Sequence, residues 1–402
     1  MNNHRISSSR FLGAVIISLF FLASCKQDQL TGPGTTSNPG NPQIPKSPGT
    51  IMIPADNLMT PEKVELGRHL FFDKELSVDG STACATCHDP SIGFADLRGQ
   101  ATSMGFAQRM GTRNAPSLAN IAYNTFLTWD GRFPSLEKHA AGPIFNSLEM
   151  GNNFSTTQRD TTPSDYNSGP GPFDTNFLFK RLIGHTQDPQ QKGYADLFVA
   201  AWGSSEISVK GVSMDHIQKS IACFERTFIS TQSMFDQYNN GSATAYKNNA
   251  PALQGFQLFT GKANCVSCHN GYNFTDQQFH NNGIGVGPNN IFDTVGGTGG
   301  TDIGRMSITK KQEDRYKFKT PSLRNVALTA PYMHDGRYSS LADVINKNYN
   351  HGGNDPNVVN KDPNIKALNL TPDEVTAIVE FLKTLNDPAF TVNPNFANPW
   401  LK

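Results

Sequence analysis

The sequence predicts a mainly α-helical protein in which one structural unit occurs twice. Apolar residues recur at helical spacing in several segments, for example at Ile217, Ile221 and Phe224. Residues 116–136 and 321–341 are identical at ten of 21 positions without a gap, where chance would give about one or two. The same pattern, C-x-x-C-H, precedes each copy. Few segments alternate as β-strands do, so we expect helices joined by long polar loops.

The composition restricts what the protein can bind. The 402 residues include 34 basic and 34 acidic side chains, so no excess positive charge indicates a nucleic-acid partner or an anionic membrane surface. The chain is 37% hydrophobic and contains 27 Phe, too many apolar groups for a disordered coil. At about 150 residues per domain, its length fits two or three domains. Six cysteines are too few for a disulfide scaffold of this size.

Residues 1–24 have the features of an export signal. Arg5 and Arg10 precede the apolar run 11–22, which is too short to span a membrane. The run ends in the pattern L-A-S-C, which is typical of bacterial lipoproteins and predicts that Cys25 carries a lipid anchor. An ordinary signal peptide with an incidental cysteine is the alternative. We expect an exported protein in the periplasm or anchored to the outer membrane.

The remaining chain is expected to form a tether and two domains. Residues 25–50 hold five Pro and four Gly, a composition of flexible linkers. An N-terminal domain is expected over residues 51–210 and a C-terminal domain over 211–402, with one C-x-x-C-H motif in each. Pro61 suits the first position of a helix, and the capping box at residues 371–374 should begin another.

C-x-x-C-H is the attachment motif of c-type haem. Two thiols one short turn apart can bond the two vinyl groups of a porphyrin, and the adjacent histidine reaches the iron. A zinc site or two short disulfides would not require a histidine after each cysteine pair, so these readings are weaker. We therefore expect two covalently bound haem c groups. The motif residues are Cys84, Cys87 and His88 in the first copy and Cys265, Cys268 and His269 in the second.

The sixth ligand of a haem iron decides between electron transfer and chemistry. No histidine lies between His88 and His139, and Met104 and Met110 in this interval are typical of packing positions. The first haem is therefore expected to keep a position open for peroxide. The candidate ligands for the second haem are Tyr349, His351, His334 and Met333.

An ordered set of segments resembles the bacterial di-haem cytochrome c peroxidase family, which includes the MauG-type enzymes. The resemblance implies two cytochrome c-like haem domains in tandem with long irregular loops. It places the peroxidatic haem in the first domain and the electron-entry haem in the second, with calcium and a tryptophan between them. The segments that carry it are residues 84–88, 113–117, 129–132, 142–143, 148–150, 224–227, 265–269 and 329–336.

The family's functional residues match five positions of this chain. The inter-haem tryptophan is Trp129, for which core packing is the ordinary alternative. The calcium ligands are the Asn114 side chain and the backbone carbonyls of Thr329 and Pro331, oxygen ligands that suit Ca²⁺. The distal carboxylate is Glu149, which would move protons during O–O cleavage. Solvent exposure is the ordinary alternative for a single glutamate.

The sequence departs from the family at two positions. His139 stands where the family has Gln, so it either acts as a proton shuttle or only donates a hydrogen bond. The second-haem ligand should lie 17 residues after Pro331, and that position is Asn348. A one-residue insertion would make Tyr349 the ligand. Methionine raises a haem potential, whereas a phenolate lowers it.

Three further residues have open roles. Cys223 has no partner at a motif spacing, and we expect a buried core thiol. Arg132 and Arg337 either bind haem propionates, whose carboxylates suit a guanidinium fork, or pair with Asp130 and Asp335.

The sequence therefore predicts a peroxidase that reduces hydrogen peroxide to water with electrons from cytochrome c or a similar small redox protein. The alternatives are a MauG-like oxidase of a protein or organic substrate, and a pure electron carrier. Glu149 argues against the carrier. A homodimer is implied by the family alone, and membrane contact is expected through the lipid anchor only.

Overall fold

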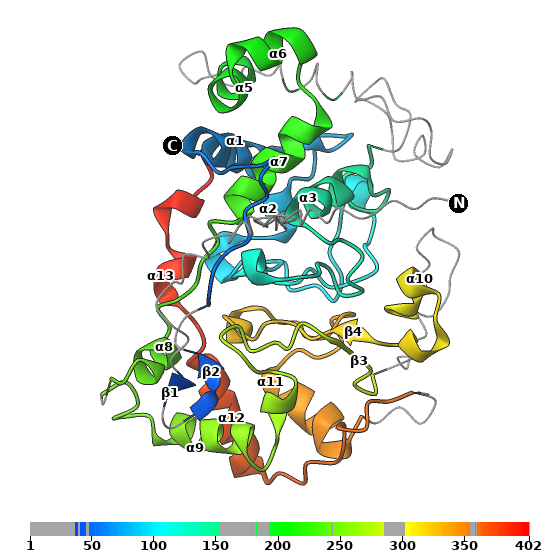
Figure 1. Cartoon of the computed structure of the whole chain (residues 1–402). Helices are drawn as coiled ribbons and strands as arrows, with labels where there is room; N and C mark the ends of the chain where they lie inside the picture. The colour runs from blue at the N-terminus through cyan, green and yellow to red at the C-terminus, as the bar shows by residue number, and fades with distance from the viewer. Residues whose placement is uncertain are drawn as a thin grey trace, which may run out of the picture. The chain divides into compact units, whose positions relative to one another are not determined.

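Helices dominate the computed structural model, which confirms the predicted class (Figure 1). The structure describes residues 37–38, 41–45, 48–152, 178, 182, 193–242, 244–284, 302–353, 358 and 360–401. The expected signal and Cys25 lie outside these residues. None of the described helices is long and apolar enough to span a membrane.

The helices are short and joined by irregular loops. The α-helices are α1 (Pro61–Phe72), α2 (Cys84–Cys87), α3 (Leu136–Phe145), α5 (Tyr194–Trp202), α6 (Ser204–Lys210), α7 (Met214–Glu225), α8 (Met234–Asn239), α9 (Ala250–Thr260), α10 (Met306–Thr309), α11 (Leu341–Asp343), α12 (Pro372–Lys383) and α13 (Pro388–Thr391). The 3-10 helices are Lys74–Leu76, Pro90–Ile92, Phe106–Gln108, Ile121–Tyr123, Cys265–Ser267, Gln312–Asp314, Val326–Leu328, Tyr349–His351 and Pro394–Phe396. A π-helical turn covers Val344–Asn348.

The described residues contain two small antiparallel sheets. β1 (Ser37–Asn38) pairs with β2 (Asn41–Pro45) inside the segment expected to be a tether. β3 (Phe279–His280) pairs with β4 (Phe318–Lys319). These pairs fit the sequence-based expectation of few strands.

Both predicted helix starts are confirmed. Helix α1 begins at Pro61 behind the N-cap Thr60, whose side chain accepts a hydrogen bond from the first turn. Helix α12 begins behind the reciprocal capping box of Thr371 and Glu374. Side-chain oxygens therefore satisfy backbone N–H groups that have no partner within either helix.

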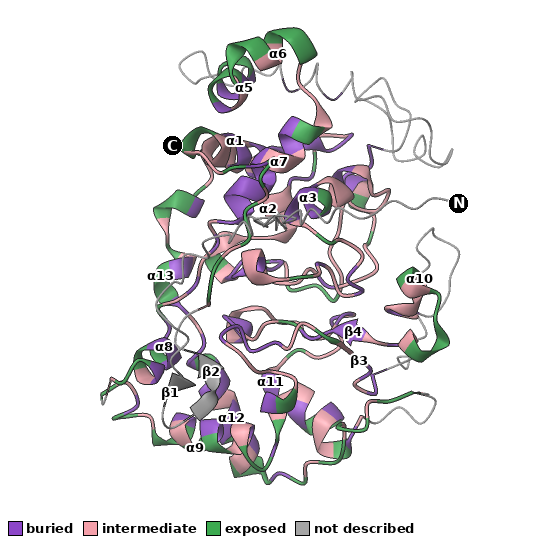
Figure 2. Cartoon of the chain, in the orientation of Figure 1, coloured by how far each residue is buried: buried purple, intermediate pink, exposed green. Residues whose placement is uncertain are grey.

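Helices α1 and α7 cross at close range in the first core. A Cβ atom added to Gly67 would lie 2.0 Å from the carbonyl oxygen of Ser220, so only glycine permits this approach. Leu66, Phe71 and Ile217 are fully buried around the crossing. Figure 2 shows buried residues on α7 where it passes α1.

Helices α9 and α12 repeat this arrangement in the second core. A Cβ atom added to Gly255 would lie 1.9 Å from the carbonyl oxygen of Ala377. Phe259 and Phe381 are buried there, with ring centroids 5.0 Å apart. Each C-x-x-C-H motif is thus accompanied by one close helix pair.

Two later segments also contribute to the first core. Phe228 follows α7 and stacks on Phe94 with ring centroids 3.8 Å apart. Phe396, near the end of the chain, lies 5.5 Å from the same ring. The sequence assigns both segments to the range 211–402. Their apolar side chains are buried in the cluster around Phe94, against which Cys84 of the first motif also packs.

The internal repeat is visible as two copies of one turn. Leu127 bridges to Phe133 in the first copy, and Tyr332 bridges to Tyr338 at the same relative positions in the second. A left-handed asparagine precedes a 3-10 helix in each copy, with φ of 57° and 59°. The repeated sequence therefore encodes a repeated backbone.

We expect Gly255→Ala to destabilise the protein, although alanine normally favours a helix interior by up to about 1 kcal/mol over glycine. The new methyl group would overlap the Ala377 carbonyl, which belongs to a packed backbone. The free energy of unfolding should fall by about 1–3 kcal/mol in urea titrations followed by circular dichroism.

Gly193→Ala is the matched control, because Gly193 has φ −65° and nothing within 4 Å of the added methyl. Equal stability of the two variants would contradict the close-crossing argument.

Candidate functional site

The first motif presents a histidine with one defined tautomer. Cys84 and Cys87 begin and end the single turn of α2, and His88 follows directly. Nδ1 of His88 lies 2.9 Å from the carbonyl oxygen of Phe94. A carbonyl only accepts hydrogen bonds, so Nδ1 carries the proton and Nε2 keeps its lone pair for a metal.

The second motif repeats this device. Nδ1 of His269 donates to the carbonyl oxygen of Phe274 at 2.9 Å. Burial lowers the pKa of both His88 and His269, which favours the neutral imidazole that ligates iron.

None of the described cysteines forms a disulfide, and Cys223 is buried with its Sγ 3.4 Å from Oδ1 of Asn57. Burial raises the pKa of Cys87 to about 11 and that of Cys265 to about 12.

Each motif lines a cavity, which is what haem attachment requires. Cys84, Cys87 and His88 line a cavity of about 50 Å³. The second motif lines a larger cavity of about 280 Å³ that extends to Trp129 and His139. The donor set and the tautomers therefore fit a covalently attached haem at each motif, and a cavity adjoins each of them.

The first cavity also receives His139 and Glu149. His139 lies on α3, and Glu149 lies in the turn that follows this helix. Nδ2 of Asn146 donates to Oε1 of Glu149 at 2.6 Å, which orients the carboxyl group. The N–H of Phe106 donates to the Glu149 carbonyl at 2.7 Å, which anchors the backbone of the turn. The structure thus brings His88, His139 and Glu149 to one cavity.

Burial sets the protonation of these two groups. It raises the pKa of Glu149, against the opposing influence of Arg132 and Asn146. It lowers the pKa of His139 to about 3, and the charges of His88 and Arg132 act in the same direction. Nδ1 of His139 is buried without a hydrogen-bond partner among the described residues. His139 is therefore neutral at physiological pH.

A second carboxyl group lines the first cavity, and the sequence alone predicts no role for it. Glu225 ends α7, is 3% exposed, and its Oε2 has no hydrogen-bond partner in the described part of the chain. Burial raises its pKa to about 8, although the charge of Arg226 opposes this. The only signal in the sequence is its position in the segment 224–227.

Met150 lines the same cavity and is buried, whereas Met104 and Met110 do not line it.

Trp129 lies between the two halves of the repeat and lines the larger cavity. Its indole N–H donates to the carbonyl of Asn114 at 2.9 Å, and its own carbonyl accepts from the N–H of Lys319 at 2.8 Å. The His334 ring, at the equivalent position of the second copy, lies 6.5 Å away and stacks on Phe318. The indole is thus bonded to the first half, and the backbone of Trp129 is bonded to the second.

The turn that carries Trp129 is held by a buried ion triad. Arg113 donates to Asp130 at 2.6 Å and, through two nitrogens, to Asp302 at 2.7 and 2.8 Å. Burial opposes ionisation of Asp130, but the charge of Arg113 keeps the pKa of this carboxyl below its ordinary value. Asp302 belongs to the second half of the sequence, so the triad connects the halves.

The three expected calcium ligands line one cavity. Asn114, Thr329 and Pro331 all contribute to the wall of the larger cavity. The amide of Asn114 donates through Nδ2 to Ala101 at 3.2 Å, which directs its oxygen away from that partner. Oxygen donors from these positions suit calcium.

The candidate ligands of the second haem differ in position. Tyr349 lines the cavity with His269, and its hydroxyl accepts from Asn282 at 3.4 Å. Met333 and buried His334 line it as well, whereas His351 is exposed and does not. Asn348 is buried and donates to the Asn282 carbonyl at 3.2 Å. The π turn at residues 344–348 directly precedes Tyr349 and holds one residue more than an α turn.

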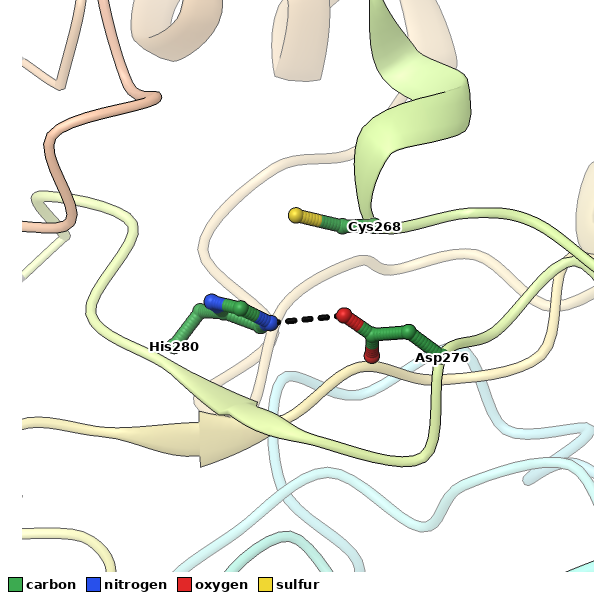
Figure 3. A group of neighbouring side chains, drawn as sticks. All are labelled: Cys268, Asp276 and His280. Carbon is green, nitrogen blue, oxygen red and sulfur yellow. Dashed lines mark hydrogen bonds and ion pairs between the residues drawn. The ribbon is translucent and has the colours of Figure 1, made fainter.

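A carboxylate–imidazolium–carboxylate clamp lies beside the second motif. Figure 3 shows His280 facing Asp276, with Cys268 close to both. Nε2 of His280 lies 2.7 Å from Asp276, and Nδ1 lies 2.6 Å from Asp362. The bond to Asp276, followed by Cys268, raises the pKa of His280 to about 11. Both nitrogens therefore carry protons, and no lone pair is left for a metal ion at this cluster.

We expect His280→Gln to destabilise the protein by about 1–3 kcal/mol at pH 6, because both carboxylates lose a charged partner. The folded pKa of His280 lies above its ordinary value of 6.5, so this stabilisation is complete below about pH 6.5 and is lost as the pH rises toward about 11. Urea unfolding at pH 6 and pH 10 should therefore show a larger effect at pH 6. Exposed His351→Gln is the control, and a pH-independent loss would contradict the clamp.

Comparisons with known proteins agree with this geometry. The family model for di-haem cytochrome c peroxidase matches residues 61–244, and the cytochrome c model matches residues 252–386. The methylamine utilization protein MauG of Methylorubrum extorquens is 35% identical, over 87% of this chain and 85% of its own length. Cytochrome c551 peroxidase of Pseudomonas aeruginosa is 32% identical, over 80% and 78%.

The solved structures agree as well. A MauG-like protein associated with microbial copper homeostasis superposes with a TM-score of 0.71 at 29% identity and covers 87% of this chain and 97% of its own. The diheme peroxidase BthA from Burkholderia thailandensis shares the fold, with a TM-score of 0.61 at 21% identity. The family implies two covalently bound haem c groups, in agreement with the two motifs. The chain belongs to the di-haem cytochrome c peroxidase family, to which the MauG proteins also belong, and is an oxidoreductase.

Proposed function

We propose that the protein reduces hydrogen peroxide to water with electrons from cytochrome c or a similar small redox protein. The observation that carries this proposal is the cavity shared by His88, His139 and Glu149. Haem bound at His88 would supply the iron that binds and reduces peroxide. A pure electron carrier would have no use for a buried, oriented carboxyl group at this place.

Glu149 is proposed to take the proton from the near peroxide oxygen and return it to the leaving oxygen. Burial raises its pKa from the ordinary glutamate value toward the working pH, where a general acid–base group is most effective. Asn146 holds the carboxyl group in one orientation, so the transfer needs no rearrangement of the side chain.

His139 is proposed to donate a hydrogen bond and not to act as a base. A group with a pKa of about 3 is neutral at pH 7 and accepts protons poorly. Its unpartnered Nδ1 leaves one ring nitrogen available in the pocket. This reading gives His139 the part that Gln has in the family.

Electrons are proposed to enter through the half of the molecule that holds His269 and to pass by Trp129. The indole bonds Asn114 in the first half and lies 6.5 Å from the His334 ring of the second, which supports this role. Calcium held by Asn114, Thr329 and Pro331 would stabilise the same junction. Tyr349 is proposed as the sixth ligand at His269, because the π turn supplies the insertion that the count from Pro331 requires.

Export is part of the same proposal. The motif C-x-x-C-H and the apolar N-terminal run both favour a periplasmic location, where Cys25 would carry the lipid anchor. The named donor of one relative, cytochrome c551, supports a small haem protein as partner.

A MauG-like oxidase is the second candidate function. Tyr349 favours it, because a phenolate ligand lowers the haem potential and disfavours electron entry from a cytochrome. The 35% identity to MauG of Methylorubrum extorquens supports it as well.

Steady-state peroxide reduction by the purified holoprotein tests the function. Reduced cytochrome c should be oxidised on addition of peroxide, and Glu149→Gln should lower kcat by about 10²–10⁴-fold. Exposed Glu313→Gln serves as the control at equal haem content. Peroxide reactivity without cytochrome c oxidation would select the MauG-like candidate, and two unreactive haems would exclude both enzymes.

We expect His139→Gln to keep the pH dependence of kcat, because glutamine also donates a hydrogen bond and has no proton to exchange. His139→Leu should lower kcat by about tenfold through loss of that bond. Rates measured between pH 5 and 9 check this. Loss of one limb of the pH profile in His139→Gln would show that the imidazole acts as a base.

A further inference from the structure

Lys319 is a buried cation without a carboxylate partner in the described part of the chain. It lies on β4 and is 5% exposed. Its Nζ has one hydrogen bond among the described residues, to the carbonyl of Thr320 at 3.3 Å. Burial lowers the pKa of Lys319 to about 8, against the weaker influence of Asp276. A buried ammonium group is costly unless an anion accompanies it.

The nearby cations are already neutralised. Arg113 pairs with two aspartates, and Arg337 pairs with Asp335. Asp276, the carboxylate whose charge reaches Lys319, is bound by His280. Unlike Arg113 and Arg337, Lys319 can therefore still bind an anion.

The cavity next to Lys319 indicates which anion this is. Lys319 lines the same cavity as Cys265, Cys268 and His269, the residues expected to attach the second haem. Haem carries two propionate carboxylates and no other anionic group. A carboxylate in this wall would form a charge-assisted hydrogen bond with the ammonium group.

The backbone holds Lys319 at a defined place. Its N–H donates to the carbonyl of Trp129 at 2.8 Å, and its strand pairs with Phe279. The backbone of Lys319 is thus fixed between Trp129, which lies on the proposed electron path, and strand β3, which follows the second motif. Arg337, the sequence-based candidate for a propionate, donates instead to Asp335 and to the Ile284 carbonyl at 2.9 Å.

We propose that Lys319 binds a propionate carboxylate of the haem attached at Cys265 and Cys268. The inference rests on the second haem of the proposed function, but not on peroxide turnover. Lys319 is a positioning residue, and its positive charge stabilises the reduced haem. Its removal therefore lowers the reduction potential of the second haem and leaves that of the first unchanged.

The test measures both haem potentials in the holoprotein by spectroelectrochemical titration at pH 7. In Lys319→Gln, the potential of the second haem should fall by an amount equivalent to about a tenfold change in the ferric–ferrous equilibrium, which is 59 mV for one electron. Lys319→Arg should restore the wild-type value. Lys317→Gln is the matched control, because Lys317 is two residues away and pairs with Asp314 at 3.2 Å.

Unchanged potentials in Lys319→Gln, or an equal shift in Lys317→Gln, would overturn the proposal. A shift at the first haem alone would overturn it too. If Lys319→Gln fails to incorporate haem, resonance Raman spectra of the wild type decide: the propionate-bending band of the second haem should shift between H₂O and D₂O. No shift would overturn the proposal, whereas covalent haem content, measured separately, reports on the proposed function.

Discussion

The buried pairing of Arg113 with Asp130 and Asp302 is the interaction on which the junction between the two haem centres depends. It joins a turn of the first repeat to a segment of the second half, and all three side chains are at most 9% exposed. Removing one partner of such a buried group costs about 3–5 kcal/mol, because the remaining charge is left unpaired. Trp129 directly precedes Asp130 in this turn, so the triad holds the backbone that carries the indole.

Duplication provides one scaffold with two chemical settings. Both motifs fix their histidine through Nδ1 and a backbone carbonyl, and both are packed by a helix pair that crosses at a glycine. The surroundings differ. Glu149 and Glu225 line the first cavity, a protonated His280 and Lys319 line the second, and the neutral His139 borders both. The carboxyl groups that can transfer protons thus lie at one centre, and the positively charged side chains lie at the other. This difference suits a division between peroxide chemistry and electron entry.

Much of the site follows from local sequence. The C-x-x-C-H motifs determine which residues can attach haem, and the ten identities of the repeat predict two related turns, because both depend on residues close together in the chain. The helix starts at Pro61 and Thr371 are equally local, since a cap needs only the residues of one turn. Tyr349 could be singled out by counting along the family pattern, but the π turn that accounts for the extra residue is a backbone feature.

Other properties depend on contacts between distant segments. The sequence by itself determined the haem ligands, the two-unit plan and the oxidoreductase family. Only the tertiary structure decided that His139 is neutral, that Glu225 joins Glu149, and that Lys319 has no carboxylate partner among the described residues. The physical reason is that desolvation and ion pairing arise from groups far apart in sequence: the backbone of Lys319 is bonded to Trp129, and Asp276, whose charge reaches Lys319, is bound by His280.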